Sequence, residues 1–179
     1  MSERKEGTLR LLTPGEIGLA RTIYGSSIIY NKVWIHCDSY LPFGLQRRDT
    51  GMTPNGEIYF RKETYSDDFS KEKYDRQHFF IHEMAHVWQH QKGMWVKLRG
   101  IVSWAADYSY DLDNNRKLNN YSLEQQAQII ADYFLLTKFG RSIWVGERSP
   151  QRCVTYIGLP DDNIRSKYET TLADFFRQR

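Results

Sequence analysis

The chain has 179 residues and a formal net charge of +3, and 40% of its residues are hydrophobic and 15% aromatic. This composition fits one folded domain over residues 1–179 and excludes a disordered chain. Its basic residues are interleaved with acidic ones, which argues against a nucleic-acid-binding protein. No segment approaches the ~20 apolar residues of a membrane span, and the N-terminus lacks the apolar core of a signal peptide. We therefore expect cytoplasmic synthesis. The two cysteines, Cys37 and Cys153, fit no metal motif and are expected to be thiols, although one bridge between them stays open.

The first half of the chain predicts one helix followed by strands. Residues 1–10 are polar and are expected to be disordered. A capping box then predicts the start of a helix, which a glycine ends about ten residues later. Segments 26–40 and 56–65 are rich in β-branched and aromatic residues and predict strands, separated by a loop rich in Gly and Pro. The residues that bound the helix are Thr13, Pro14, Glu16 and Gly25.

The second half of the chain predicts helices. Apolar residues at helical spacing predict a helix over residues 75–92 and a second over 123–139, with a polar loop at 107–122 between them. A third helix is expected from residue 163 to the C-terminus, within a C-terminal extension that covers 141–179. Strands followed by helices favour an α+β fold over a repeating βαβ plan. The residues that cap or end these helices are Gly93, Ser122 and Gly140.

The helix predicted at 75–92 carries an H-E-x-x-H motif, formed by His82, Glu83 and His86. Histidines four residues apart lie on one face of a helix, so both imidazoles can bind a single Zn²⁺ ion. Glu83 is rotated about 100° around the helix axis, and from there its carboxylate can act as a general base toward a metal-activated water. The alternative is an ordinary helix whose histidines are solvated or hydrogen-bonded.

A catalytic zinc site needs a third protein ligand and one open position. His78 and His90 extend the row of histidines, but a row of three spans about 12 Å along the axis, so its outer members cannot share one ion. Both His78 and His90 are expected either at the surface or as residues that contact the metal ligands without binding the metal. A ligand six residues after the motif is excluded because Lys92 occupies that position. A glutamate from a later helix remains, and Glu124 is the candidate; its alternative role is a charge favoured by the helix dipole. Asp132, two turns later, is a candidate partner that orients a ligand histidine.

Three segments carry a resemblance to a known family. "IHEMAHVWQHQ", "YLPFGLQ" and "YSLEQQAQIIADYF" resemble the small Vgr-related metallopeptidases of the gluzincin branch of the zincins, over residues 13–139. That family is found with VgrG and Rhs components of bacterial type VI secretion systems. The resemblance implies Zn²⁺ on His82, His86 and Glu124, with Glu83 as general base.

The resemblance also implies a zincin-like fold and a way to bind substrate. The expected fold is a small, twisted, mostly antiparallel sheet packed on the active-site helix, with a second ligand-bearing helix and a helical C-terminal tail. Segment 56–61 is expected to be an edge strand that pairs with an extended peptide. A residue that stabilises the oxyanion is also expected. The candidates for it are Tyr108, Tyr110, Tyr121 and His90.

These patterns predict a zinc-dependent peptidase that acts on a protein, a peptide or the peptides of peptidoglycan. The resemblance adds a role as a type VI secretion effector, with a VgrG or Rhs component or an immunity protein as partner, and export without a leader. Two alternatives stay open: a zinc-binding adaptor of such an assembly without turnover, and a housekeeping cytosolic peptidase. A general base beside the histidines favours an enzyme over an adaptor, because a structural zinc site has no use for one.

Overall fold

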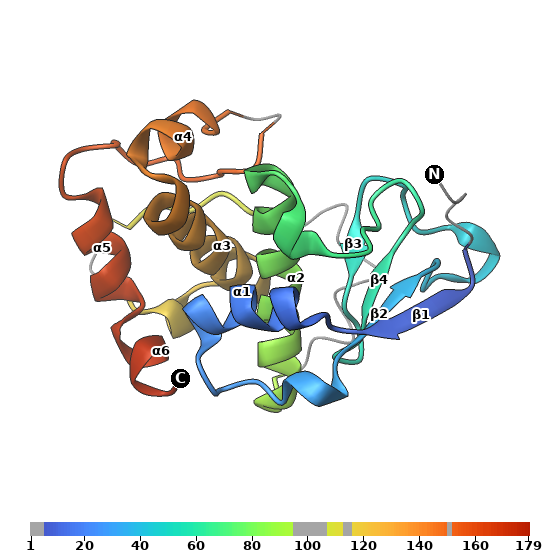
Figure 1. Ribbon diagram of the computed structural model, residues 1–179. Helices are drawn as coiled ribbons and strands as arrows, with labels where there is room; N and C mark the ends of the chain where they lie inside the picture. Colours follow the sequence, from blue (N-terminus) through green and yellow to red (C-terminus); the bar gives the residue numbers. More distant parts are fainter. Residues whose placement is uncertain (1–5, 95–106, 113–115, 150–151) are drawn as a thin grey trace.

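The protein is an α+β domain in which a small sheet covers one side of a layer of helices. We describe a computed structural model. In Figure 1 the sheet lies on the right, the C-terminal helices lie on the left, and helix α2 runs between them. Helix α2 is therefore the central element, in contact with both the sheet and helix α3. The structure describes residues 6–94, 107–112, 116–149 and 152–179.

The helices begin and end close to the residues that their capping signals predict. Helix α1 (Pro14–Tyr24) starts with the predicted capping box and ends at Gly25. Helix α2 (Tyr74–Gln91) is continuous through all four histidines of its segment. Helix α3 (Leu123–Phe139) is capped by Ser122 and stopped by Gly140, as predicted. Local sequence is sufficient here because caps and helical periodicity depend on near neighbours.

The sheet in the described part of the chain has four short strands in the order β1-β2-β4-β3. The two outer pairings, β1 with β2 and β3 with β4, are antiparallel, whereas β2 and β4 run parallel. The sheet is therefore mixed, and its middle pair departs from an antiparallel plan. The strand bounds are β1 (Thr8–Leu11), β2 (Trp34–Cys37), β3 (Gly51–Met52) and β4 (Ile58–Phe60).

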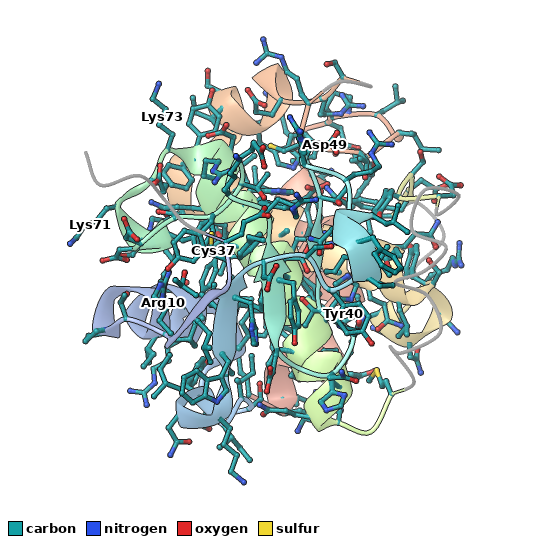
Figure 2. The ribbon with its side chains drawn as sticks, turned by 90° about the vertical axis from the view of Figure 1, so that its right-hand side faces the viewer. Arg10, Cys37, Tyr40, Asp49, Lys71 and Lys73 are labelled. Atoms are coloured by element: carbon teal, nitrogen blue, oxygen red, sulfur yellow. The ribbon has the colours of Figure 1, made fainter. Side chains whose placement is uncertain are left out.

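Two expectations about the sheet are wrong. Residues 6–10 are not disordered: strand β1 pairs with β2, and Arg61 binds Glu6 at 2.6 Å; residues 1–5 lie outside the described residues. Segment 56–61 does not form an edge, because β4 lies between β2 and β3. The edge next to helix α2 is β3, which is too short to be recognised from its sequence. Figure 2 shows this side of the molecule, with Cys37 at the end of β2 and Asp49 just before β3.

The C-terminal residues belong to the same core as the rest of the chain. The expected single helix from residue 163 is two short helices, α5 (Ile164–Thr171) and α6 (Ala173–Arg177), and α4 (Arg141–Gly146) precedes them. Trp144 and Tyr168 are fully buried and pack edge-on against each other. Residues 141–179 therefore complete the domain. None of the described helices is long and apolar enough to cross a membrane.

Candidate metal centre and adjoining cavity

Helices α2 and α3 pack closely against each other and bring the predicted ligands together. Ala85 on α2 and Ala127 and Ala131 on α3 are fully buried, and such small side chains permit a close approach of the two helix axes. Glu124 occupies the first turn of α3, two residues after the capping residue Ser122. The cap fixes where α3 begins, and so fixes the height at which Glu124 faces α2.

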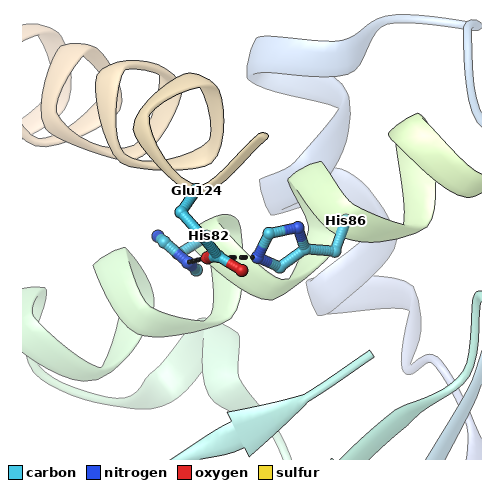
Figure 3. Close-up of side chains that lie close together, drawn as sticks. All are labelled: His82, His86 and Glu124. Carbon is cyan, nitrogen blue, oxygen red and sulfur yellow. Dashed lines mark hydrogen bonds and ion pairs between the residues drawn. The ribbon is translucent and has the colours of Figure 1, made fainter. Parts of the chain in front are cut away.

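The side chains of His82, His86 and Glu124 converge on one point (Figure 3). Their candidate ligand atoms all lie within 4.8 Å of one another. Glu124 Oε2 lies 3.5 Å from His82 Nε2 and 3.1 Å from His86 Nε2. The two imidazole rings, one helical turn apart, have centroids 5.0 Å apart. The structure thus brings together the three residues that the sequence predicts as ligands.

The distances from Glu124 to the two histidines suit a zinc ion. Tetrahedral ligands at about 2.0–2.1 Å from the metal lie ~3.3 Å from one another, and the two distances from Glu124 bracket that value. Two imidazole nitrogens and one carboxylate oxygen favour Zn²⁺ over Mg²⁺ or Ca²⁺, which prefer oxygen-only sites. No other acidic, cysteine or histidine side chain joins this group among the residues that the structure describes. Such a set leaves one coordination position open.

The electrostatics of the cluster also favour a bound cation. Burial alone lowers the pKa of His86, but the charge of Glu124 and its hydrogen bond outweigh burial and raise that pKa to about 9. Burial raises the pKa of Glu124, yet the charge on His86 and the hydrogen bond from His82 hold it well below its usual range. Without a metal, a proton on His86 therefore supplies the positive charge that Glu124 requires.

Gln89 orients one of the histidines. Its side-chain oxygen lies 2.8 Å from His86 Nδ1, and its amide nitrogen donates to the carbonyl of Leu123 at 2.9 Å. An amide oxygen only accepts hydrogen bonds, so Nδ1 of His86 must carry a proton; once the proton that Nε2 donates to Glu124 is removed, the ring is the Nδ1–H tautomer with its lone pair on Nε2. This is the tautomer that a metal ligand needs. Gln89 was not predicted as a site residue; it is three residues after His86, the helical spacing that would have signalled the contact.

Glu83 stands outside the ligand cluster and is held by strand β3 and the residue after it. Thr53 Oγ1 donates to Glu83 Oε2 at 2.6 Å, and both residues are buried. Gly51 lies so close that a Cβ atom there would be 2.5 Å from Glu83 Oε1. Strand β3 is thus shaped around the carboxylate, with a glycine where the chain must pass and a hydroxyl that fixes one oxygen. Neither contact could be read from the sequence, since 30 residues separate Thr53 from Glu83.

A cavity of about 420 Å³ opens beside the cluster. Its wall includes His82, Glu83 and Gly51, so both a candidate ligand and the candidate base face it. Tyr108 also lines it, with its ring 5.9 Å from that of His82. Burial and the nearby charges of Glu124 and Glu83 raise the pKa of Tyr108, so its hydroxyl remains a donor. No described residue accepts from that hydroxyl.

The other three oxyanion candidates lie elsewhere. The hydroxyl of Tyr110 donates to Asp132 at 2.6 Å, and that of Tyr121 donates to the carbonyl of Asp111 at 2.6 Å. His90 lies against Gly56, and it does not line the cavity. Of the four candidates, the structure brings only Tyr108 to the cavity.

One expectation about neighbouring residues is corrected, and the two places expected for His78 are narrowed to a buried one. Asp132 orients neither His82 nor His86 among the described contacts; it binds His78 Nε2 at 2.7 Å. His78 is buried, and it lines the cavity. Spacing alone could not place His78, because Asp132 and His78 meet only when α2 and α3 pack.

The remaining histidine and the two cysteines take no part in the cluster. His36 pairs with Glu57, away from the cluster. Cys37 and Cys153 are free thiols.

The fold and the site define an α+β domain with a candidate metal centre of two histidines and one glutamate between two helices. No family model matches the chain. The effector domain of Pseudomonas aeruginosa VgrG2b is a similar solved structure, 38% identical, with a TM-score of 0.66 over 82% of this chain and 85% of that domain. The chain therefore belongs to the family of the VgrG2b effector domain.

A curated relative agrees with this assignment. The type VI secretion system spike protein VgrG2b of Pseudomonas aeruginosa is 44% identical over 133 residues, which is 70% of this chain. The match covers 13% of the spike protein's length. The chain is thus related to VgrG2b through one segment of a much longer protein.

Proposed function

We propose that the protein is a zinc-dependent peptidase. The observation that carries this proposal is the convergence of His82, His86 and Glu124 from two helices while Glu83, beside them, stays outside the cluster and faces the cavity. Three protein ligands with an open position are typical of catalytic zinc sites, whereas structural sites are closed by four. A bound zinc ion supplies a Lewis acid that makes water more acidic and polarises a carbonyl group.

Each remaining role falls to a residue of this chain. Glu83 accepts a proton from the attacking water and passes it to the leaving amine. Thr53 keeps Oε2 of that carboxylate in place, so the same oxygen geometry is available in every turnover. Tyr108 provides a neutral hydroxyl at the cavity wall, where it can donate to the oxygen that becomes negative. The cavity of about 420 Å³ beside these groups lies within the ordinary size range of ligand pockets, about 300–1,000 Å³.

Glu83→Gln tests the proposal directly. The variant should bind one equivalent of zinc like the wild type, because Glu83 is not a ligand. Hydrolysis of a random-sequence peptide library should fall by about 10²–10⁴-fold, the usual contribution of a general base. Glu63→Gln, at an exposed position, is the matched control and should have full activity. If Glu83→Gln hydrolyses peptides as fast as the wild type, Glu83 is not the general base. If the zinc-loaded wild type cleaves no peptide, the peptidase proposal is wrong and the alternative of a zinc-binding adaptor is favoured.

The same proposal gives the chain an effector role in type VI secretion. Support comes from its membership of the family of the VgrG2b effector domain. A VgrG or Rhs component encoded in the same genome is the expected partner, and a protein, a peptide or the peptides of peptidoglycan are the expected substrates. A tagged chain should co-purify with that component and reach the medium only when the secretion system is intact. Secretion that continues without the system would exclude this role.

A further inference from the structure

Asp132 is a fully buried carboxylate that accepts hydrogen bonds from several parts of the fold. Within helix α3, its Oδ1 accepts a hydrogen bond from the side-chain amide of Gln128 at 2.8 Å. The hydroxyl of Tyr110 donates to it at 2.6 Å and the backbone N–H of Thr155 at 3.3 Å. His78 Nε2 on helix α2 lies 2.7 Å away. A buried charge is tolerated when its oxygens are satisfied in this way, so Asp132 serves as a fixed anchor.

The donors around Asp132 define which nitrogen of His78 carries a proton. Burial raises the pKa values of Tyr110 and Tyr168 well above the usual range, so both hydroxyls stay protonated. The proton of Tyr110 goes to Asp132, and Tyr168 donates in turn to Tyr110 at 2.5 Å. With every other partner a donor, Asp132 remains an acceptor, and His78 must present Nε2–H to it. A ring with a single proton then has its lone pair on Nδ1.

His78 lines the cavity, and Nδ1 is the ring nitrogen that does not contact Asp132. The residue is 3% exposed and lines the cavity together with His82 and Glu83. No residue in the described ranges is a hydrogen-bond partner of Nδ1. Among the described residues, the side-chain atoms that are both fully enclosed and without a hydrogen-bond partner are Trp88 Nε1 and Thr171 Oγ1. Nδ1 of His78 is not one of them, so it retains some accessible surface. Nδ1 is thus an accessible atom without a partner in a buried side chain that lines the cavity.

We propose that His78 is a substrate-binding residue, whose Nδ1 accepts a hydrogen bond from a backbone N–H of a peptide in the cavity. This inference rests on the proposed function and names a further contact of the same site. His78 lies one helical turn before His82, so a peptide bound there extends along α2 away from His86. Asp132 is a positioning residue, since it fixes the ring and its tautomer through Nε2. The network that reaches Tyr168 links the C-terminal helices to the cavity wall.

His78→Gln separates a binding role from a structural one. A glutamine side chain can keep the N–H bond to Asp132 but has no acceptor at the position of Nδ1. Loss of one hydrogen bond should raise the KM for a peptide selected from the library by about 3- to 10-fold, with kcat, zinc content and melting temperature near wild type. In the Glu83→Gln background, the Kd for that uncleaved peptide should rise by the same factor. His36→Gln, outside the cavity, is the matched control.

The outcomes distinguish the two proposals. If the wild type hydrolyses peptides and His78→Gln leaves both KM and Kd unchanged, His78 does not bind substrate and the peptidase proposal stands. If His78→Gln lowers the melting temperature and zinc content instead, its role is structural and the binding proposal is overturned. His78→Asn provides a second check, because it removes the contact with Asp132 and should destabilise the fold. A wild type that cleaves no peptide removes the proposed function, and the role of His78 with it.

Discussion

Gly51→Ala tests whether strand β3 positions Glu83. The added Cβ would lie 2.5 Å from Glu83 Oε1 and 2.6 Å from its Cδ, whereas real Cβ contacts are essentially never under 3.0 Å and are ordinary from 3.4 Å. The strand and the carboxylate must therefore separate by about 0.5–0.9 Å. That movement also disturbs the 2.6 Å bond from Thr53, which anchors the other oxygen.

A displacement of about 1 Å at a reacting group can cost ~10²-fold in rate, so kcat should fall by roughly that factor. Zinc content should be unchanged, because neither Gly51 nor Glu83 is a candidate ligand. Gly18→Ala is the matched control: a Cβ there meets nothing within 4 Å, and alanine should stabilise helix α1 by about 0.5–1 kcal/mol. The assay is steady-state hydrolysis with zinc analysis and thermal unfolding of both variants. Wild-type kcat in a folded, zinc-loaded Gly51→Ala protein would refute the reasoning.

Further variants and conditions test the rest of the site. Thr53→Val should keep zinc and lower kcat by about 10-fold or more, since a hydrogen bond to a charged group is worth about 1.5–3 kcal/mol. Thr53→Ser keeps the hydroxyl and should have nearly wild-type activity. If both variants had the same kcat, the hydroxyl would have no role in catalysis. Glu124→Ala should weaken zinc binding by more than the roughly 10–100-fold that loss of an outer partner costs, and unchanged affinity in a competition titration would exclude it as a ligand. The pKa of His86 is raised to about 9 in the folded apoprotein, so its pairing stabilises the apoprotein fully below the unfolded value of about 6.5 and is lost as pH rises through 9. Zinc must displace that proton, so affinity should rise with pH up to about 9, and titrations from pH 6 to 10 that show a flat profile would contradict this. Glu16 is fully buried and accepts two 2.8 Å bonds from an arginine, so Glu16→Ala should lower the free energy of unfolding by about 3–5 kcal/mol in a urea titration.

The sequence by itself determined the parts of this protein that depend on near neighbours. The capping box at Thr13 and the cap at Ser122 set where α1 and α3 begin, and glycines end both helices. The four-residue spacing of His82 and His86 determined that both imidazoles share one face of α2. These features follow from backbone geometry within a few residues, and the sequence therefore expresses them directly.

Only the tertiary structure decided how distant segments meet. The candidate ligand set is complete because α3 packs against α2 and brings Glu124 to the histidines. Gly51 in strand β3 leaves room for Glu83, and Thr53 just after the strand binds its carboxylate. Asp132 binds Nε2 of His78, which lines the cavity. Such contacts join residues 30 or more positions apart, and their geometry arises from packing and strand order, which no local periodicity records. Helices α1, α2 and α3 could thus be predicted from the sequence, whereas the division of the C-terminal helices, the surroundings of the base and the wall of the cavity depend on the fold.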